Sequence, residues 1–293
     1  MTTLTWIANT AVSWLDTAEA LVAGGEIVDT ALADALTNET RQLRIVLDEH
    51  GIDTAPFFNH AVPLAYHESG DRALATVALR KTLGSDAHSS AIGDVAMALT
   101  EFKHAGNRAH PKLLDDLTLR SRPIREQWEG RGPGLLAGVA QRTESTVLVD
   151  DARIFVVHPI RGGGGVAHPW ENSVRIEAVL TNPIGELPEI VRLAWLLAGL
   201  NVDLPRYSER LNSPLRLIVA RLALVPVVLG AAADVELVRP SAELLPLALR
   251  TWGFAAESSD RFAPIVERWW QTYQEMKLPW PGALAALEQM LTG

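Results

Sequence analysis

The chain has 293 residues, of which 48% are hydrophobic and 21% charged, a composition typical of soluble globular proteins. This composition excludes an intrinsically disordered chain. The 21 glycines and 17 prolines follow no repeating period, which excludes a collagen-like or mucin-like chain. The 35 acidic residues outnumber the 26 basic ones, and the resulting net charge of −9 argues against a nucleic-acid partner. The length predicts about two domains.

The chain contains no cysteine. Disulfides, cysteine nucleophiles, iron–sulfur clusters and cysteine-based zinc sites are therefore excluded. The N-terminus lacks the basic and apolar regions of a secretory signal. The longest uncharged apolar run, residues 222–233, is shorter than the roughly 20 residues of a membrane span and is interrupted by Pro226. We therefore expect a cytoplasmic protein with no membrane partner.

Residues 1–117 predict a helical bundle, which we take as the first domain. Apolar residues recur there at intervals of three and four, in stretches that end at Gly51, Gly84 and Gly106. The first 20 residues, which include Trp6 and Leu15, fit the same period. We expect about four or five helices joined by short loops, and no strand longer than about three residues.

The second predicted domain, residues 118–293, contains the β pattern. Residues 153–160 are rich in β-branched and aromatic side chains, and residues 172–181 alternate between apolar and polar. The apolar set from 174 to 180 would face the core, and Arg175 and Glu177 would face solvent or a site. Because a glycine run separates the two segments, we expect a long antiparallel hairpin. The fold class is α+β and mainly helical: an N-terminal helical bundle plus a small antiparallel sheet covered by helices.

Helical patterns flank this hairpin on both sides. Residues 122–142 predict a helix that is broken or kinked at the Gly-Pro-Gly of 132–134, followed by a short strand near 146–149. Ser213 and Pro214 form an N-cap and first-turn pair that predicts a later apolar helix. Residues 234–238 predict one more strand, and three final helices follow.

The four consecutive glycines from Gly162 to Gly165 are the most unusual local feature. Glycine permits positive φ and lets backbone N–H groups approach a ligand, so Gly163 and Gly164 could cradle an anion beside Arg161. Neither a Walker A sequence nor a dinucleotide-binding fingerprint is present. We interpret the run as a mobile hairpin loop, with an anion-binding loop and a partner-binding flap as alternatives.

Histidines are the remaining candidates for metal binding. His158 and His168 bracket the glycine loop and could meet Glu171 at a zinc ion. Because no His-Glu-x-x-His sequence occurs, we expect neither a metal nor another cofactor. The order helix, strand, glycine hairpin, strand, helix is similar to that of zincin peptidases. The corresponding helix near 189–195 contains no histidine, so this similarity would imply a scaffold without the metal or the hydrolysis.

Arginines gather in the same part of the sequence. Arg125 and Arg131 lie on the predicted 122–142 helix, and Arg161 and Arg175 lie in the hairpin region. They could converge on a carboxylate or phosphate group, or be neutralised by neighbouring glutamates in surface pairs. The adjacent carboxylates of Asp150 and Asp151 are expected to be solvated in a turn.

Two functional hypotheses remain. The first is a non-enzymatic binding or protein-interaction module with an unknown protein partner. Exposed tryptophans would favour an interface, including one between copies of the chain. The alternative is a hydrolase-like enzyme acting on an anionic small molecule or peptide between residues 122–131 and 161–175. Arginines would bind that substrate, and His158 or His168 would act as acid or base. A pocket beside the two histidines and Arg175 would favour the enzyme.

Overall fold

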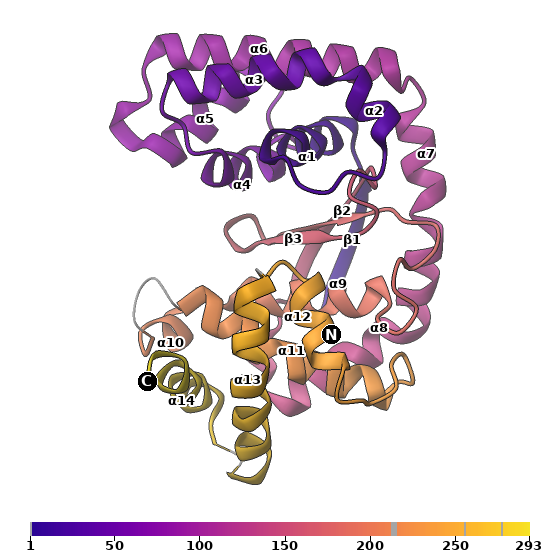
Figure 1. The fold of residues 1–293 in the computed structure, drawn as a ribbon, viewed down its shortest axis with the longest axis vertical. Coiled ribbons are helices and arrows are strands. Elements are labelled where there is room, and N and C mark those ends of the chain that lie inside the picture. The colour runs from indigo at the N-terminus through magenta and orange to yellow at the C-terminus, as the bar shows by residue number, and fades with distance from the viewer. Residues whose placement is uncertain (1, 212–215, 255, 277) are drawn as a thin grey trace.

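The computed structural model describes residues 2–211, 216–254, 256–276 and 278–293, with the side chains of 256–258 left aside. Helices dominate the described residues and surround one four-stranded sheet. In Figure 1 the helices of the N-terminal part lie on one side of this sheet and those of the C-terminal part on the other. The expected class, α+β and mainly helical, is confirmed.

The sheet is mixed. Its strands are β1 (Thr3–Ala8), β2 (Asp151–Val157), β3 (Gly165–His168) and β4 (Ser173–Glu177), in the order β1-β2-β4-β3. β2 runs parallel to both β1 and β4, and β3 alone is antiparallel, to β4. The predicted hairpin is therefore only partly right, because the glycine run joins β2 to β3 and the antiparallel turn lies at 169–172. β4 ends at Glu177, and Leu180, predicted to be buried, is 52% exposed.

Strand β1 overturns the prediction that residues 1–117 contain no long strand. It spans six residues, and its Leu4 and Ile7 lie opposite Ala152 and Phe155 of β2. Its alternation of threonines with Leu4 and Trp6 is a strand pattern, which is too short to stand out from the helical period that follows. The helix begins only after Asn9, whose side chain accepts a hydrogen bond from the backbone N–H of Val12 at 3.0 Å.

The N-terminal helices form the predicted bundle, although they are more numerous than the four or five expected. They are α1 (Thr10–Ala23), α2 (Thr30–Ala35), α3 (Thr37–Glu49), α4 (Thr54–Leu64), α5 (Asp71–Leu83) and α6 (Ser89–Ala109), with a short 3₁₀ turn η1 (Gly84–Asp86). Helix α1 packs against β2 and so connects the bundle to one face of the sheet. Helices α7 (Leu113–Arg120) and α8 (Arg122–Arg142) then run along the side of the molecule to its other half (Figure 1).

Helix α8 is continuous through residues 132–134, so of the two predicted alternatives, a break or a kink, the break is wrong. Two glycines of α8 allow close packing against α11 (Arg216–Asp234) and the residue that follows it. A Cβ on Gly138 would lie 2.8 Å from the Cβ of Ala231, and one on Gly134 would lie 3.1 Å from Val235 Cγ1. The short strand predicted near 146–149 is instead the 3₁₀ turn η2 (Ser145–Val147).

The C-terminal helices cover the opposite face of the sheet. They are α9 (Glu189–Ala198), α10 (Pro205–Ser208), α11, α12 (Leu244–Thr251), α13 (Ala256–Met276) and α14 (Trp280–Thr292), with 3₁₀ turns η3 (Pro169–Glu171) and η4 (Gly199–Asn201). Every residue of α9 is buried, and α9 packs on β3 and β4. The strand predicted at 234–238 is absent from this described stretch because α11 extends to Asp234. The predicted cap at Ser213 and Pro214 lies outside the described residues.

Helix α11 is long and apolar enough to cross a membrane by length and composition alone. In the most apolar 18-residue stretch of this helix, 67% is buried inside the protein. Its contacts with α8, α9 and α12 are those of a central core helix, an arrangement compatible with a soluble protein.

Candidate functional site

A cluster of buried charged side chains lies beneath the glycine loop. Its members are Asp16 and Glu19 from α1, Arg161 from the loop after β2, and Arg175 and Glu177 from β4. Arg175 and Glu177 are each 1% exposed, so of the two expected surroundings, solvent or a site, solvent is wrong. They face α1 because they lie on the side of β4 opposite to Val174 and Ile176.

The two arginines of this cluster are neutralised by carboxylates of the same chain. Arg175 Nε lies 3.1 Å from Asp16 Oδ1, and its guanidinium also pairs with Glu19. Arg161 Nη1 lies 3.4 Å from Asp16 Oδ1 and 3.5 Å from Glu177 Oε1. Two guanidinium groups thus face three carboxylates, and neither arginine is left free for an external anion.

Glu177 fixes the glycine loop in place. The backbone N–H of Gly163 donates to Glu177 Oε2 at 2.7 Å, and that of Arg161 donates to Oε1 at 3.0 Å. Gly162 and Gly163 adopt φ values of 78° and 137°, which residues with a Cβ atom rarely adopt. Burial, together with the nearby charge of Asp16, raises the pKa of Glu177 to about 7.

A second buried ion pair holds the loop from the α9 side. Arg192 Nη1 lies 3.3 Å from Glu189 Oε2, with 7% and 2% of the two side chains exposed. The backbone N–H of Gly164 donates to Glu189, whose pKa is raised by burial. The N–H groups that could cradle an external anion are therefore donated to Glu177 and Glu189.

The candidate zinc residues do not converge. His158 Nε2 lies 2.9 Å from Asp29 Oδ2, and burial lowers the pKa of this histidine. His168 is buried on β3, where desolvation and the charge of Arg175 lower its pKa well below the usual value. Glu171 pairs instead with Lys81 at 3.4 Å. Within the described ranges no group of three or more histidine, aspartate or glutamate side chains could hold a metal ion.

The two arginines predicted on α8 also lie outside the cluster. Arg125 lies over the ring of Trp6 at 6.0 Å. Arg131 approaches Glu236 at 4.0 Å, and both of these side chains are more than half exposed. Of the predicted site residues, the fold therefore gathers Arg161, Gly163 and Arg175, with Gly164 beside them, but it gathers them around internal carboxylates.

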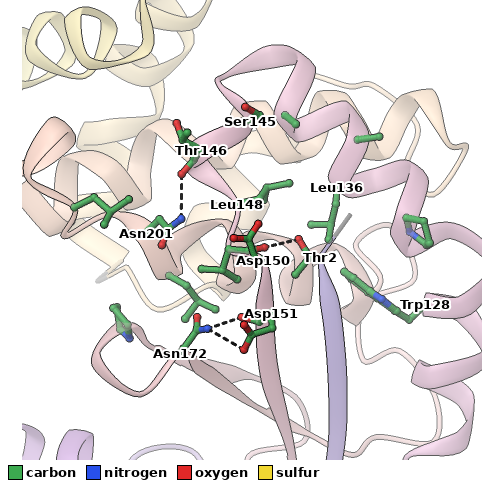
Figure 2. Close-up of a pocket in the computed structure, with 17 residues that line it drawn as sticks. Thr2, Trp128, Leu136, Ser145, Thr146, Leu148, Asp150, Asp151, Asn172 and Asn201 are labelled. Atoms are coloured by element: carbon green, nitrogen blue, oxygen red, sulfur yellow. Dashed lines mark hydrogen bonds between the residues drawn. The ribbon is translucent and has the colours of Figure 1, made fainter.

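A cleft of about 960 Å³ lies at the amino ends of the three parallel strands, where they meet α8 (Figure 2). Its apolar wall combines residues of α8 with the segment around η4: Trp128, Pro133, Leu136, Leu148, Leu200 and Leu204. Its polar wall is formed by Thr2, Ser145, Thr146, Asp150, Asp151, Asn172 and Asn201. In the view of Figure 2, Asp150 lies between Thr2 and Asn201.

Thr2, Asn172 and Asn201 of the polar wall donate hydrogen bonds inside the protein, and Asn172 Nδ2 reaches the Asp151 carboxylate at 3.5 Å. Thr2 Oγ1 donates to the Val149 carbonyl at 2.8 Å, and Asn201 Nδ2 donates to the Thr146 carbonyl at 3.0 Å. Asp150 and Asp151 are both exposed, and neither forms an ion pair among the described residues. The cleft therefore presents negative charge beside an apolar surface.

Sequence reasoning assigned these two aspartates to a solvated turn and so missed the cleft. The available signal was their position at the start of β2, one of the two inner strands of the sheet. Nothing in the local pattern places α8 and η4 opposite them. Comparisons with protein-family models, curated proteins and solved structures found no match for this chain.

Proposed function

We propose that this protein is a non-enzymatic binding module whose cleft takes a segment of a partner protein carrying a basic side chain. The observation that carries this proposal is the pair of exposed carboxylates, Asp150 and Asp151, beside the apolar wall of a cleft of about 960 Å³. We further propose that it works in the cytoplasm, in keeping with a chain that contains no cysteine.

The size and lining of the cleft support this function. Ligand sites have volumes of roughly 300–1,000 Å³ and combine apolar walls with a few polar groups that fix orientation. Leu204 is 39% exposed at the wall and Leu136 lies within it, so an aliphatic or aromatic side chain of a partner could be buried there. The carboxylates would then pair with a neighbouring lysine or arginine, and the net charge of −9 would favour the encounter.

The alternative, a hydrolase-like enzyme with an anionic substrate, has less support. Arg161 and Arg175 are occupied by internal carboxylates, and Arg125 and Arg131 lie elsewhere. The described residues that line the cleft include no histidine that could serve as acid or base. The carboxylates there would also repel an anion.

Selection of peptides from a displayed random library tests the proposal. The wild-type protein, the double variant Asp150→Asn/Asp151→Asn and the control Asp115→Asn would each be used as bait. Asp115 is exposed on α7 and does not line the cleft. Peptides selected by the wild type and the control should be enriched in Lys or Arg next to apolar residues, and should bind the double variant roughly tenfold more weakly.

The same experiment distinguishes the two hypotheses. Selected peptides recovered intact after incubation, as judged by their mass, support a binding module. Peptides recovered as fragments support the hydrolase. Enrichment of acidic peptides, or equal binding by the double variant, would contradict the proposed role of the cleft.

A further inference from the structure

A second, smaller cavity of about 160 Å³ lies between the edge strand β3, α9 and α11. Its wall includes the rings of Trp170 and Trp195 and the aliphatic side chains of Leu196 and Leu217. Among the described residues, Pro169 alone lines both this cavity and the acidic cleft. A ligand bound here would therefore have its own set of contacts.

Arg221 of α11 contributes a guanidinium group to this wall. The group lies over the ring of Trp195 at 4.9 Å and over that of Phe254 at 5.6 Å. The indole N–H of Trp195 donates to the backbone carbonyl of Arg221 at 3.0 Å, which fixes the two residues relative to each other. The cation is thus held against aromatic faces at the edge of a cavity.

No carboxylate pairs with Arg221 among the described residues, in contrast to Arg142 and Arg192. Arg142 has Asp234 at 2.7 Å, and Arg192 has Glu189 at 3.3 Å. Desolvation lowers the pKa of Arg221, although the side chain keeps an exposed surface. The guanidinium therefore lies at the cavity wall, over two aromatic rings, with part of the side chain open to solvent.

Two charged side chains line the cavity among the described residues, Arg221 and Asp203. Asp203 pairs at 3.6 Å with Arg216, which is not a lining residue, so its negative charge is offset from outside the wall. The charge of Arg221 remains uncompensated. Because Arg221 has no carboxylate partner among the described residues, an anionic ligand gains both an ion pair and hydrogen bonds by approaching it.

We propose that this cavity binds a small aromatic carboxylate of about the size of benzoate, with its carboxylate on Arg221 and its ring against Trp195 and Leu196. A cavity of about 160 Å³ matches a single ring, since an apolar cavity of roughly 150 Å³ holds benzene. The planar guanidinium group can donate two parallel hydrogen bonds to a carboxylate. Small anions that lack two parallel oxygens fit this geometry less well. This inference concerns a site separate from the cleft and does not depend on the proposed function.

Calorimetric titration of the full chain with benzoate, and with benzamide as a neutral molecule of the same shape, tests the proposal. Arg221→Gln removes the charge. Gly199→Leu fills the cavity, because Gly199 lines it and a Cβ there meets nothing within 4 Å. Arg250→Gln, at an exposed position of α12 outside the cavity, is the matched control. The thermal melt of each variant reports on folding.

We expect the wild type to bind benzoate saturably and to bind benzamide at least tenfold more weakly. Arg221→Gln and Gly199→Leu should each lose a comparable factor in affinity for benzoate. Arg250→Gln should bind benzoate as the wild type does. Equal binding of benzamide and benzoate, unchanged affinity in Arg221→Gln, or no saturable binding at millimolar benzoate would overturn the proposal. If Arg221→Gln failed to fold, the benzamide comparison and Gly199→Leu would still decide it.

Discussion

Asp16 on α1 and Arg175 on β4 form an ion pair inside the protein, with 3.1 Å between Oδ1 and Nε and at most 2% of either side chain exposed. The pair joins the N-terminal helical bundle to the centre of the sheet. Glu19 and Arg161 extend it, so that α1, the loop after β2 and β4 share one charged network. Each arginine of the network pairs with two or more carboxylates of the chain, so the network fixes these elements relative to one another.

Arg175→Ala should strongly destabilise the protein. The substitution leaves Asp16 and Glu19 without their closest cation, and removing one partner of a buried ion pair costs about 3–5 kcal/mol. Arg131→Ala breaks only the exposed contact with Glu236 and should change the free energy of unfolding by about 0–1 kcal/mol. Urea unfolding of the two variants measures the difference, and equal losses would show that the buried network contributes nothing.

The stability of the protein should depend on pH through Glu177. Its pKa of about 7 in the folded chain exceeds the ordinary value of 4.5, so the folded state holds this proton more tightly than the unfolded state. The stabilisation is complete below pH 4.5 and is lost as the pH rises through about 7. Glu177→Gln keeps the shape but does not titrate, so its stability should fall less over this interval.

Unfolding free energies at several pH values, measured for wild type, Glu177→Gln and Glu126→Gln, check this expectation. Glu126 is exposed on α8 and should leave the wild-type profile unchanged. The difference in unfolding free energy between wild type and Glu177→Gln isolates the contribution of Glu177. The histidines with lowered pKa values contribute to both proteins, and they make stability rise with pH rather than fall. A difference that does not vary with pH would refute the assignment.

Gly163→Ala should destabilise the protein by about 1–3 kcal/mol. Its φ of 137° is disfavoured for alanine, and the added Cβ would lie 2.9 Å from Pro183 Cγ. The control is Gly185→Ala, where φ is not positive and a Cβ meets nothing within 4 Å. Thermal melts of both variants provide the measurement, and a neutral Gly163→Ala would mean that the loop can adopt another conformation.

The fold could be predicted from sequence where the pattern is local. Leu43 and Leu47 mark the buried side of α3, and Val174 and Ile176 mark one buried face of β4, as their spacing indicates. The parallel pairing of β1 with β2 could not be predicted, because it joins segments at opposite ends of a long helical stretch. Local periodicity also does not reveal that α1 covers the second face of β4 and buries Glu177.

The candidate sites were harder to predict for the same reason. The arginines near the hairpin could be found by residue type, but their partners Asp16 and Glu19 lie on α1, far away in the sequence. The cleft depends on α8, η4 and the starts of three strands meeting at one place. Asp150 and Asp151 carry no local signal that separates a cleft from a solvated turn.

Reversing the charge of the cleft tests its binding role most directly. In the variant Asp150→Lys/Asp151→Lys both exposed carboxylates become cations, and the apolar wall is unchanged. The affinities of wild type and variant would be measured for a basic peptide selected on the wild type and for its analogue with glutamate in place of each lysine or arginine. If the cleft recognises a basic segment, the wild type prefers the basic peptide and the variant prefers the acidic analogue. An unchanged preference in the folded variant would contradict binding at the cleft.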